Sequence, residues 1–188
     1  MQKKSQKKLD LTYSEEVIDI VQFGSSIMNG KTFNDIDVAV IFNKIPLKDQ
    51  LEYSQEIKRQ IEKYFDKPIH MQSYDLYSFF DKGNFAKESI LFYGKSLITD
   101  EYFSQNFGLI PKIQLNYSLI KLEKKDKIKF NYTLNGRGGN YGLLRQYNGK
   151  LLNPGLIEIP PECEEVFLKT LKEITSDIKI NKTFKMSQ

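Results

Sequence analysis

The 188-residue chain is long enough for one domain, or for one domain with a small second module, and 28 Lys and Arg against 24 Asp and Glu give it a net charge of +4. Its single cysteine, Cys163, excludes an intrachain disulfide and favours a reducing compartment. No run approaches the ~18 uninterrupted apolar residues of a membrane span, and no apolar segment follows the basic N-terminus. We therefore expect a cytoplasmic protein with no membrane partner.

The first part of the chain predicts a small α+β domain over residues 11–104, preceded by a disordered basic arm over 1–10. Its elements are expected in the order strand, turn, strand, helix, strand, helix, which gives a small mixed sheet with flanking helices. The strands are expected over 17–23, 35–42 and 69–74, and the helices over 47–65 and most of 75–94. The first helix is expected to bury Leu47, Leu51, Ile57, Ile61 and Phe65.

The pattern weakens over 101–118, where we expect the chain to cross to a small basic α+β module over 109–184. In this module, residues 127–134 alternate between polar and apolar, which predicts a strand with its lysines on one face. The remaining elements are expected as a flexible glycine-rich turn over 136–142, a strand over 152–160, a helix over 161–174 and a last strand over 177–181.

Two aspartates share one face of the second predicted strand. Asp35 and Asp37 are two residues apart, and such residues point to the same side of a strand. Two close carboxylates repel each other unless a cation lies between them, and Mg²⁺ prefers oxygen ligands, so the pair predicts a divalent-metal site. The turn before the strand, Gly24-Ser25-Ser26, lets the backbone approach a phosphate and donate hydrogen bonds to it. The alternative is an edge strand whose aspartates only face solvent.

These residues carry a family resemblance. Gly24-Ser25, followed after nine residues by Asp35-Ile36-Asp37, resembles the signature of the polymerase-beta-like nucleotidyltransferase superfamily, and its small prokaryotic minimal nucleotidyltransferases most of all. The resemblance spans roughly residues 15–100 and includes the segment Ile90–Ile98 as a late helix ending in a glycine. It implies a nucleotidyltransferase fold that binds a nucleoside triphosphate, with Mg²⁺ or Mn²⁺ at Asp35 and Asp37.

The family supplies a third carboxylate on a later strand, and here the chain departs from it. The corresponding place is taken by His70, the only histidine, with Gln72 on the same strand face and Asp75 just beyond. His70 can bind a softer ion such as Mn²⁺ or act as a base near neutral pH. The alternatives are a structural histidine and a site that no longer catalyses, and Asp75 is a candidate substitute acid.

The second part of the chain is basic. Residues 1–108 carry 14 Lys and Arg against 16 Asp and Glu, whereas residues 109–188 carry 14 against 8. Such asymmetry suggests an anionic partner, RNA or DNA, although a merely solvated lysine-rich surface explains it equally well. The candidate nucleic-acid residues are Lys124, Lys125, Lys127, Lys129, Arg137 and Arg145.

The predicted reaction is metal-dependent transfer of a nucleoside monophosphate from a triphosphate to an acceptor hydroxyl, with nucleic acid favoured as the acceptor. Two alternatives stay open. One is a catalytically degenerate relative that binds nucleotide or nucleic acid. The other is an adenylyltransferase antitoxin that modifies a partner toxin, since the resemblance to minimal nucleotidyltransferases implies a protein acceptor.

Overall fold

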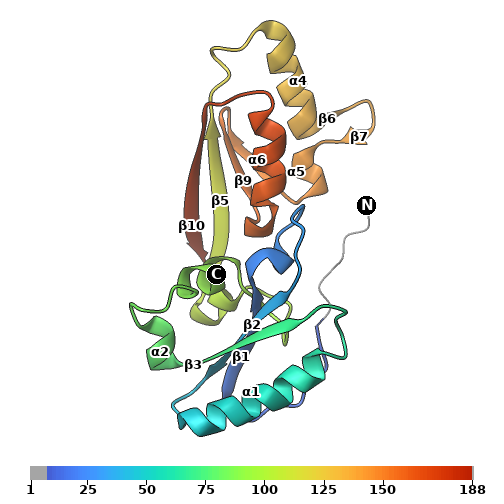
Figure 1. The fold of residues 1–188 in the computed structure, drawn as a ribbon. Helices are drawn as coiled ribbons and strands as arrows, with labels where there is room; N and C mark the ends of the chain where they lie inside the picture. The colour runs from blue at the N-terminus through green and yellow to red at the C-terminus, as the bar shows by residue number, and fades with distance from the viewer. Residues whose placement is uncertain (1–7, 188) are drawn as a thin grey trace. The chain divides into compact units, whose positions relative to one another are not determined.

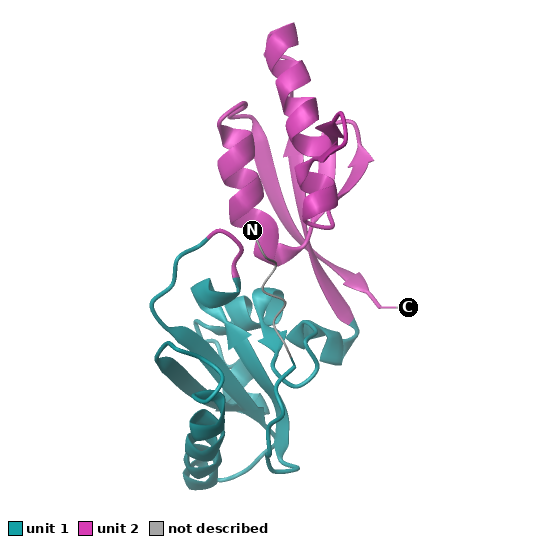
Figure 2. Ribbon diagram, turned by 90° about the vertical axis from the view of Figure 1, so that its right-hand side faces the viewer, with its two compact units in different colours: residues 1–27, 31–108 teal, residues 28–30, 109–188 magenta. Residues whose placement is uncertain are grey.

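The computed structural model describes residues 8–187, which excludes most of the arm predicted over 1–10. The chain folds as two compact units, one of residues 1–27 with 31–108 and one of residues 28–30 with 109–188 (Figure 2). Packing begins at Leu9, whose side chain is buried and whose amide donates a hydrogen bond to the Leu97 carbonyl. Helices and strands mix in both units, so the predicted α+β class is confirmed.

The first unit is built on a four-stranded mixed sheet with the order β3-β2-β1-β4 (Figure 1). Strand β2 pairs antiparallel with β1 and parallel with β3. The elements are β1 (Val17–Phe23), η1 (Gly24–Ile27), β2 (Ile36–Phe42), α1 (Leu47–Ile61), β3 (Ile69–Asp75), α2 (Leu76–Phe80), α3 (Lys87–Tyr93), β4 (Lys95–Ser96) and η2 (Phe103–Phe107), where η marks a 3-10 helix.

Apolar side chains cover both faces of this sheet, which is why β1 and β2 are almost continuously buried. Ile36, Val38 and Val40 of β2 pack on one face with Ile57 and Ile61 of α1. The opposite face forms a second cluster, in which Ala39 and Ile41 pack with Phe79, Ile90 and Phe103. By the alternation of the strand, Asp37 lies on this second face, near the start of β2.

Two helix predictions in this unit need correction. The helix predicted over 47–65 ends at Ile61, and Leu47 and Leu51 are exposed because the buried face is the stripe of Gln50, Ser54, Ile57 and Ile61. The helix predicted over 75–94 is two short helices, because residues 81–86 break it.

The second unit contains a four-stranded antiparallel sheet with the order β10-β5-β9-β8 and a two-stranded hairpin, β6-β7. Its buried side chains include Ile113 and Leu115 on the sheet and Phe130 and Phe167 on the helices. The elements are β5 (Leu109–Tyr117), α4 (Lys124–Asn135), β6 (Gly136–Arg137), β7 (Asn140–Tyr141), α5 (Leu143–Gln146), β8 (Lys150–Asn153), β9 (Leu156–Ile159), η3 (Pro161–Cys163), α6 (Glu164–Lys172) and β10 (Ile178–Met186).

The strand predicted over 127–134 is wrong, because these residues lie in helix α4. The lysines therefore do not share one face, and only Phe130 and Leu134 are fully buried, one helical turn apart. The chain does pass from the first unit to the second within 101–118, between residues 108 and 109, but the prediction missed the nine-residue strand β5 that begins there. Over residues 8–187, no helix is long and apolar enough to cross a membrane.

Candidate metal and phosphate site

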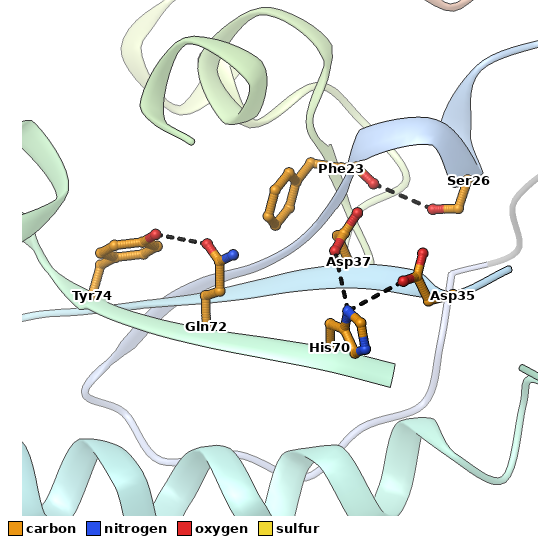
Figure 3. Close-up of polar contacts among 7 residues, drawn as sticks. All are labelled: Phe23, Ser26, Asp35, Asp37, His70, Gln72 and Tyr74. Atoms are coloured by element: carbon orange, nitrogen blue, oxygen red, sulfur yellow. Dashed lines mark hydrogen bonds and ion pairs between the residues drawn. The ribbon is translucent and has the colours of Figure 1, made fainter. Parts of the chain in front are cut away.

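Strand pairing brings the two aspartates and the histidine together at one end of the first sheet. In the registers of β2, Asp37 lies opposite Phe23 of β1 and opposite His70 of β3. Asp35 immediately precedes β2, and Figure 3 shows its carboxylate turned toward the His70 ring. The polar atoms of Asp35, Asp37 and His70 therefore lie close together.

The distances in this group suit a shared cation. His70 Nδ1 lies 3.2 Å from Asp35 Oδ2 and 3.9 Å from Asp37 Oδ1. One ligand atom from each residue lies within 4.8 Å of the others. Asp37 is the most enclosed of the three, with 28% of its side chain exposed against 62% for His70, so the site is open to solvent on the histidine side.

The surroundings of Asp37 disfavour the deprotonated, charged form of its carboxyl group. Partial burial raises the pKa of Asp37 above its ordinary value of 3.8, and the neighbouring Asp35 carboxylate raises it further. His70 acts in the opposite direction and lowers this pKa, but it does not offset the other two effects. A divalent cation among these groups would remove the repulsion that a single histidine leaves in place.

Gly24 makes the approach of η1 to the aspartates possible. Its φ is +75°, a left-handed conformation that residues with a side chain rarely adopt. A Cβ at this position would also collide with the Asp37 carboxylate oxygen Oδ2. The turn therefore brings backbone close to the carboxylates in a way that only glycine allows.

The two serines of the turn differ in what their hydroxyls contact. Ser26 Oγ accepts a hydrogen bond from Gln22 Nε2 at 2.9 Å and donates one to the Phe23 carbonyl at 3.2 Å (Figure 3). Both hydrogen bonds of the Ser26 hydroxyl therefore stay within β1 and the turn. Ser25 is half-buried. Of the three residues predicted to contact phosphate, Gly24 and Ser25 therefore remain the better candidates.

Asp75 and Gln72 do not join the group of Asp35, Asp37 and His70. Asp75 is at the far end of β3, five residues from His70, or about 16 Å along a strand. Its carboxylate caps α2 by accepting a hydrogen bond from the Ser78 amide, and these Ser78 hydrogen bonds hold its pKa below the ordinary value. Gln72 Oε1 accepts a hydrogen bond from the Tyr74 hydroxyl at 2.6 Å (Figure 3). Asp75 is therefore a helix cap, and His70 is the third member of the group.

The predicted nucleic-acid residues lie in the second unit, on α4 and around the β6-β7 hairpin. Lys124, Lys125 and Lys129 are exposed, whereas Lys127 is half-buried because of the helical phase. Two contacts between arginines and aromatic rings were not predicted here. The Arg137 guanidinium lies 4.7 Å from the Tyr132 ring centroid, and the Arg145 guanidinium lies 4.0 Å from that of Tyr141. The interleaving of arginines with tyrosines was the only signal that could have indicated them.

No protein-family model matches the chain, and neither curated protein sequences nor solved structures match it.

Proposed function

We propose that the first unit is a metal-dependent nucleotidyltransferase of the polymerase-beta-like type. One observation supports this most: the ligand atoms of Asp35, Asp37 and His70 converge beside a turn whose glycine lets the backbone come close to the Asp37 carboxylate. The order of the elements agrees with it, because the turn joins β1 to the strand that carries both aspartates.

The residues present fit a divalent cation. Two carboxylates and one imidazole form a mixed oxygen and nitrogen donor set, and burial together with the neighbouring Asp35 carboxylate raises the pKa of Asp37. Imidazole is a better ligand for Mn²⁺ and related ions than for Mg²⁺, so we expect Mn²⁺ to be preferred. When bound, the cation would neutralise phosphate charge in the transition state.

The remaining roles belong to the chain itself. The backbone at Gly24 and Ser25 contacts the phosphates, and the Ser26 hydroxyl holds the turn. His70 presents Nδ1 to the carboxylates, which favours a ligand role over that of a base. In the reaction, the acceptor oxygen bonds to the α-phosphorus, the bond to the bridging oxygen breaks, and pyrophosphate leaves with that electron pair. The acceptor's proton passes to solvent.

The test is isothermal titration of ATP or CTP, with Mn²⁺, Mg²⁺ or EDTA, into the wild type and an Asp35→Asn/Asp37→Asn variant. We expect binding that requires metal in the wild type and at least tenfold weaker binding in the variant. Glu52→Gln/Glu56→Gln, on the exposed face of α1, removes the same charge away from the site and serves as the control. Equal metal-dependent binding by the wild type and the aspartate variant would contradict the proposal.

A second candidate is a binding protein that has kept this site without turnover. The observation that favours it is the histidine in place of a third carboxylate. Incubation with labelled triphosphates, Mn²⁺ and either an RNA pool or a protein lysate separates the cases. Label in RNA supports a nucleic-acid acceptor, and label in a protein band supports the antitoxin-like alternative. Nucleotide binding without any transfer supports the binding protein.

A further inference from the structure

A surface hollow of the second unit, between the β6-β7 hairpin and helix α5, is lined by two of the three arginines in the chain. Arginine occurs three times, at positions 59, 137 and 145, although Lys and Arg together number 28. Arg137 and Arg145 both line this hollow of about 250 Å³, together with Asn135, Gly136, Gly138, Gly139, Asn140 and Tyr141. Arginine is rare in this lysine-rich protein, and two of the three arginines lie at this one hollow.

Each of these arginines is held by an aromatic ring. Arg137 stacks on Tyr132 and Arg145 stacks on Tyr141, at 4.7 and 4.0 Å from the ring centroids. Stacking orients a guanidinium without using its N–H donors, which stay free to bind a phosphate through two hydrogen bonds. Tyr132 and Tyr141 are 42% and 64% exposed, so aromatic surface remains accessible.

The hollow has no compensating negative charge. None of its lining residues is acidic. Within the part of the chain that the structure describes, neither Arg137 nor Arg145 has a carboxylate at ion-pair distance. Two positive charges therefore line the same hollow without an acidic partner, which is the arrangement expected of an anion site.

The glycines shape the edge of this hollow. Gly138 and Gly139 form the two-residue turn of the hairpin with φ of +60° and +87°, as such turns require. A Cβ on either glycine would meet nothing within 4 Å. The turn is thus open on its outer side, where backbone can approach a ligand.

Helix α4 extends the positive surface away from the hairpin. Lys125, Lys129 and Tyr132 are exposed and follow one another at spacings of four and three residues, which places them on one stripe of the helix. The stripe is about 10 Å long at the rise of an α-helix and ends at the tyrosine that carries Arg137. Charge and aromatic surface therefore continue beyond the size of a single phosphate.

We propose that Arg137, Arg145, Tyr141 and the α4 stripe form a binding site for single-stranded nucleic acid. The arginines and lysines bind successive phosphates, and a base stacks on Tyr141 or on the guanidinium plane beside it. Exposed rings and a positive track longer than one phosphate favour a polynucleotide over a phosphopeptide or free phosphate. This binding does not depend on the proposed nucleotidyl transfer.

The test is fluorescence anisotropy of the full chain with a labelled 20-nucleotide oligo(U) or oligo(dT), in EDTA without triphosphate, over a range of salt. Four engaged phosphates predict a log–log slope of about −2.8 for a single strand. Arg137→Gln/Arg145→Gln should flatten this slope by about 1.4. The matched control, Lys169→Gln/Lys172→Gln on α6, removes the same charge and should change the slope much less.

The ring is tested separately from the charge. Tyr141→Leu should weaken binding about fivefold or more and flatten the slope by no more than about 0.7, the share of Arg145, whereas Tyr141→Phe keeps the ring and should bind like the wild type. A strand of the same length without bases should bind about fivefold more weakly than oligo(U). Asp35→Asn/Asp37→Asn should bind normally, so that failure here and failure of the proposed nucleotidyl transfer can be told apart.

Three results would overturn the proposal. The first is a slope near zero in the wild type for both RNA and DNA. The second is an equal change in the arginine and α6 variants, which would mean that only net charge matters. The third is a loss of specificity for nucleic acid. It would be seen as equal binding of the baseless strand and oligo(U), or as a phosphopeptide that competes as well as the oligonucleotide.

Discussion

Two carboxylates of the first sheet, Asp19 and Asp37, show how similar electrostatics can serve different purposes. Burial raises the pKa of both above the ordinary value. Asp19 is 4% exposed and accepts hydrogen bonds from Ser96 Oγ at 2.6 Å, the Ile20 amide at 2.8 Å and Asn106 Nδ2 at 2.8 Å. Asp37 has another carboxylate and a histidine as neighbours instead.

The contrast shows that a raised carboxyl pKa does not by itself indicate a functional site. The donors around Asp19 join β1, β4 and η2 into one network, so its oxygens are used for structure. Asp37 remains partly exposed, near a second acid and a close glycine turn, so its oxygens remain available to a cation. The partners of the carboxylate therefore distinguish the two, and substitutions can test the distinction.

The largest effect on stability is expected at Asp19. Asp19→Ala should lower the free energy of unfolding by about 3 kcal/mol, because the buried Ser96 hydroxyl and the Asn106 amide lose their acceptor. Urea denaturation measures this change. Asp37→Ala should cost far less stability but abolish metal binding, which Asp19→Ala should leave intact. An equal loss of stability in both variants would contradict the distinction between a structural Asp19 and an Asp37 that is available to a cation.

A smaller loss is expected at the turn that approaches Asp37. Gly24→Ala should cost about 2 kcal/mol of stability, because alanine is strained at a φ of +75°. It should also weaken Mn²⁺ binding, because the new methyl displaces the Asp37 carboxylate. Gly83→Ala is the control, since a Cβ at Gly83 meets nothing within 4 Å and its φ is ordinary. Unchanged metal affinity in Gly24→Ala would argue against close contact between the turn and the site.

The third member of the group should set the choice of cation. His70→Asp replaces a nitrogen ligand by oxygen, so the ratio of Mn²⁺ to Mg²⁺ affinity should fall about tenfold, or about 1.4 kcal/mol. Calorimetric titration of each metal in the presence of nucleotide measures the ratio. If His70→Ala and His70→Asp both bind the two metals with the affinities of the wild type, His70 is not a ligand.

The smallest effect is a change in pH dependence. A raised pKa means that the folded state holds its proton more tightly than the unfolded state. The stabilising contribution of Asp37 is therefore present at low pH and is lost as pH rises above the ordinary value of 3.8 through the folded-state pKa. Without divalent metal, Asp37→Asn should flatten the stability profile over this range, and Asp19→Asn should flatten it too.

Added Mn²⁺ should affect the stability of the Asp37 and Asp19 variants differently. Because the cation binds the deprotonated carboxylate, it should stabilise the wild type more as pH rises, and this gain should be absent in Asp37→Asn but present in Asp19→Asn. Thermal denaturation with and without Mn²⁺ measures the gain. A gain of the same size in both variants would remove Asp37 from the metal site.

Local patterns were sufficient for three of the four strands of the first unit, with β4 missed, and for the pair of aspartates. Alternation along a strand places Asp35 and Asp37 on one side whatever the strand packs against, because the period of two is a backbone property. Their meeting with His70 depends instead on the register of β2 against β3, some thirty residues away in the chain. Only the resemblance to a family indicated that position in advance.

Local patterns were not sufficient where two periods fitted the same residues. Phe130 and Leu134 are four apart, so they share a face both in a strand and in a helix, and 127–134 was wrongly predicted as a strand. Packing chose the helix, which turned Lys127 partly inward and placed Lys125, Lys129 and Tyr132 on one exposed stripe. Composition already made the second unit basic, but which charges stand together was decided by tertiary packing, because only packing sets the phase of a helix.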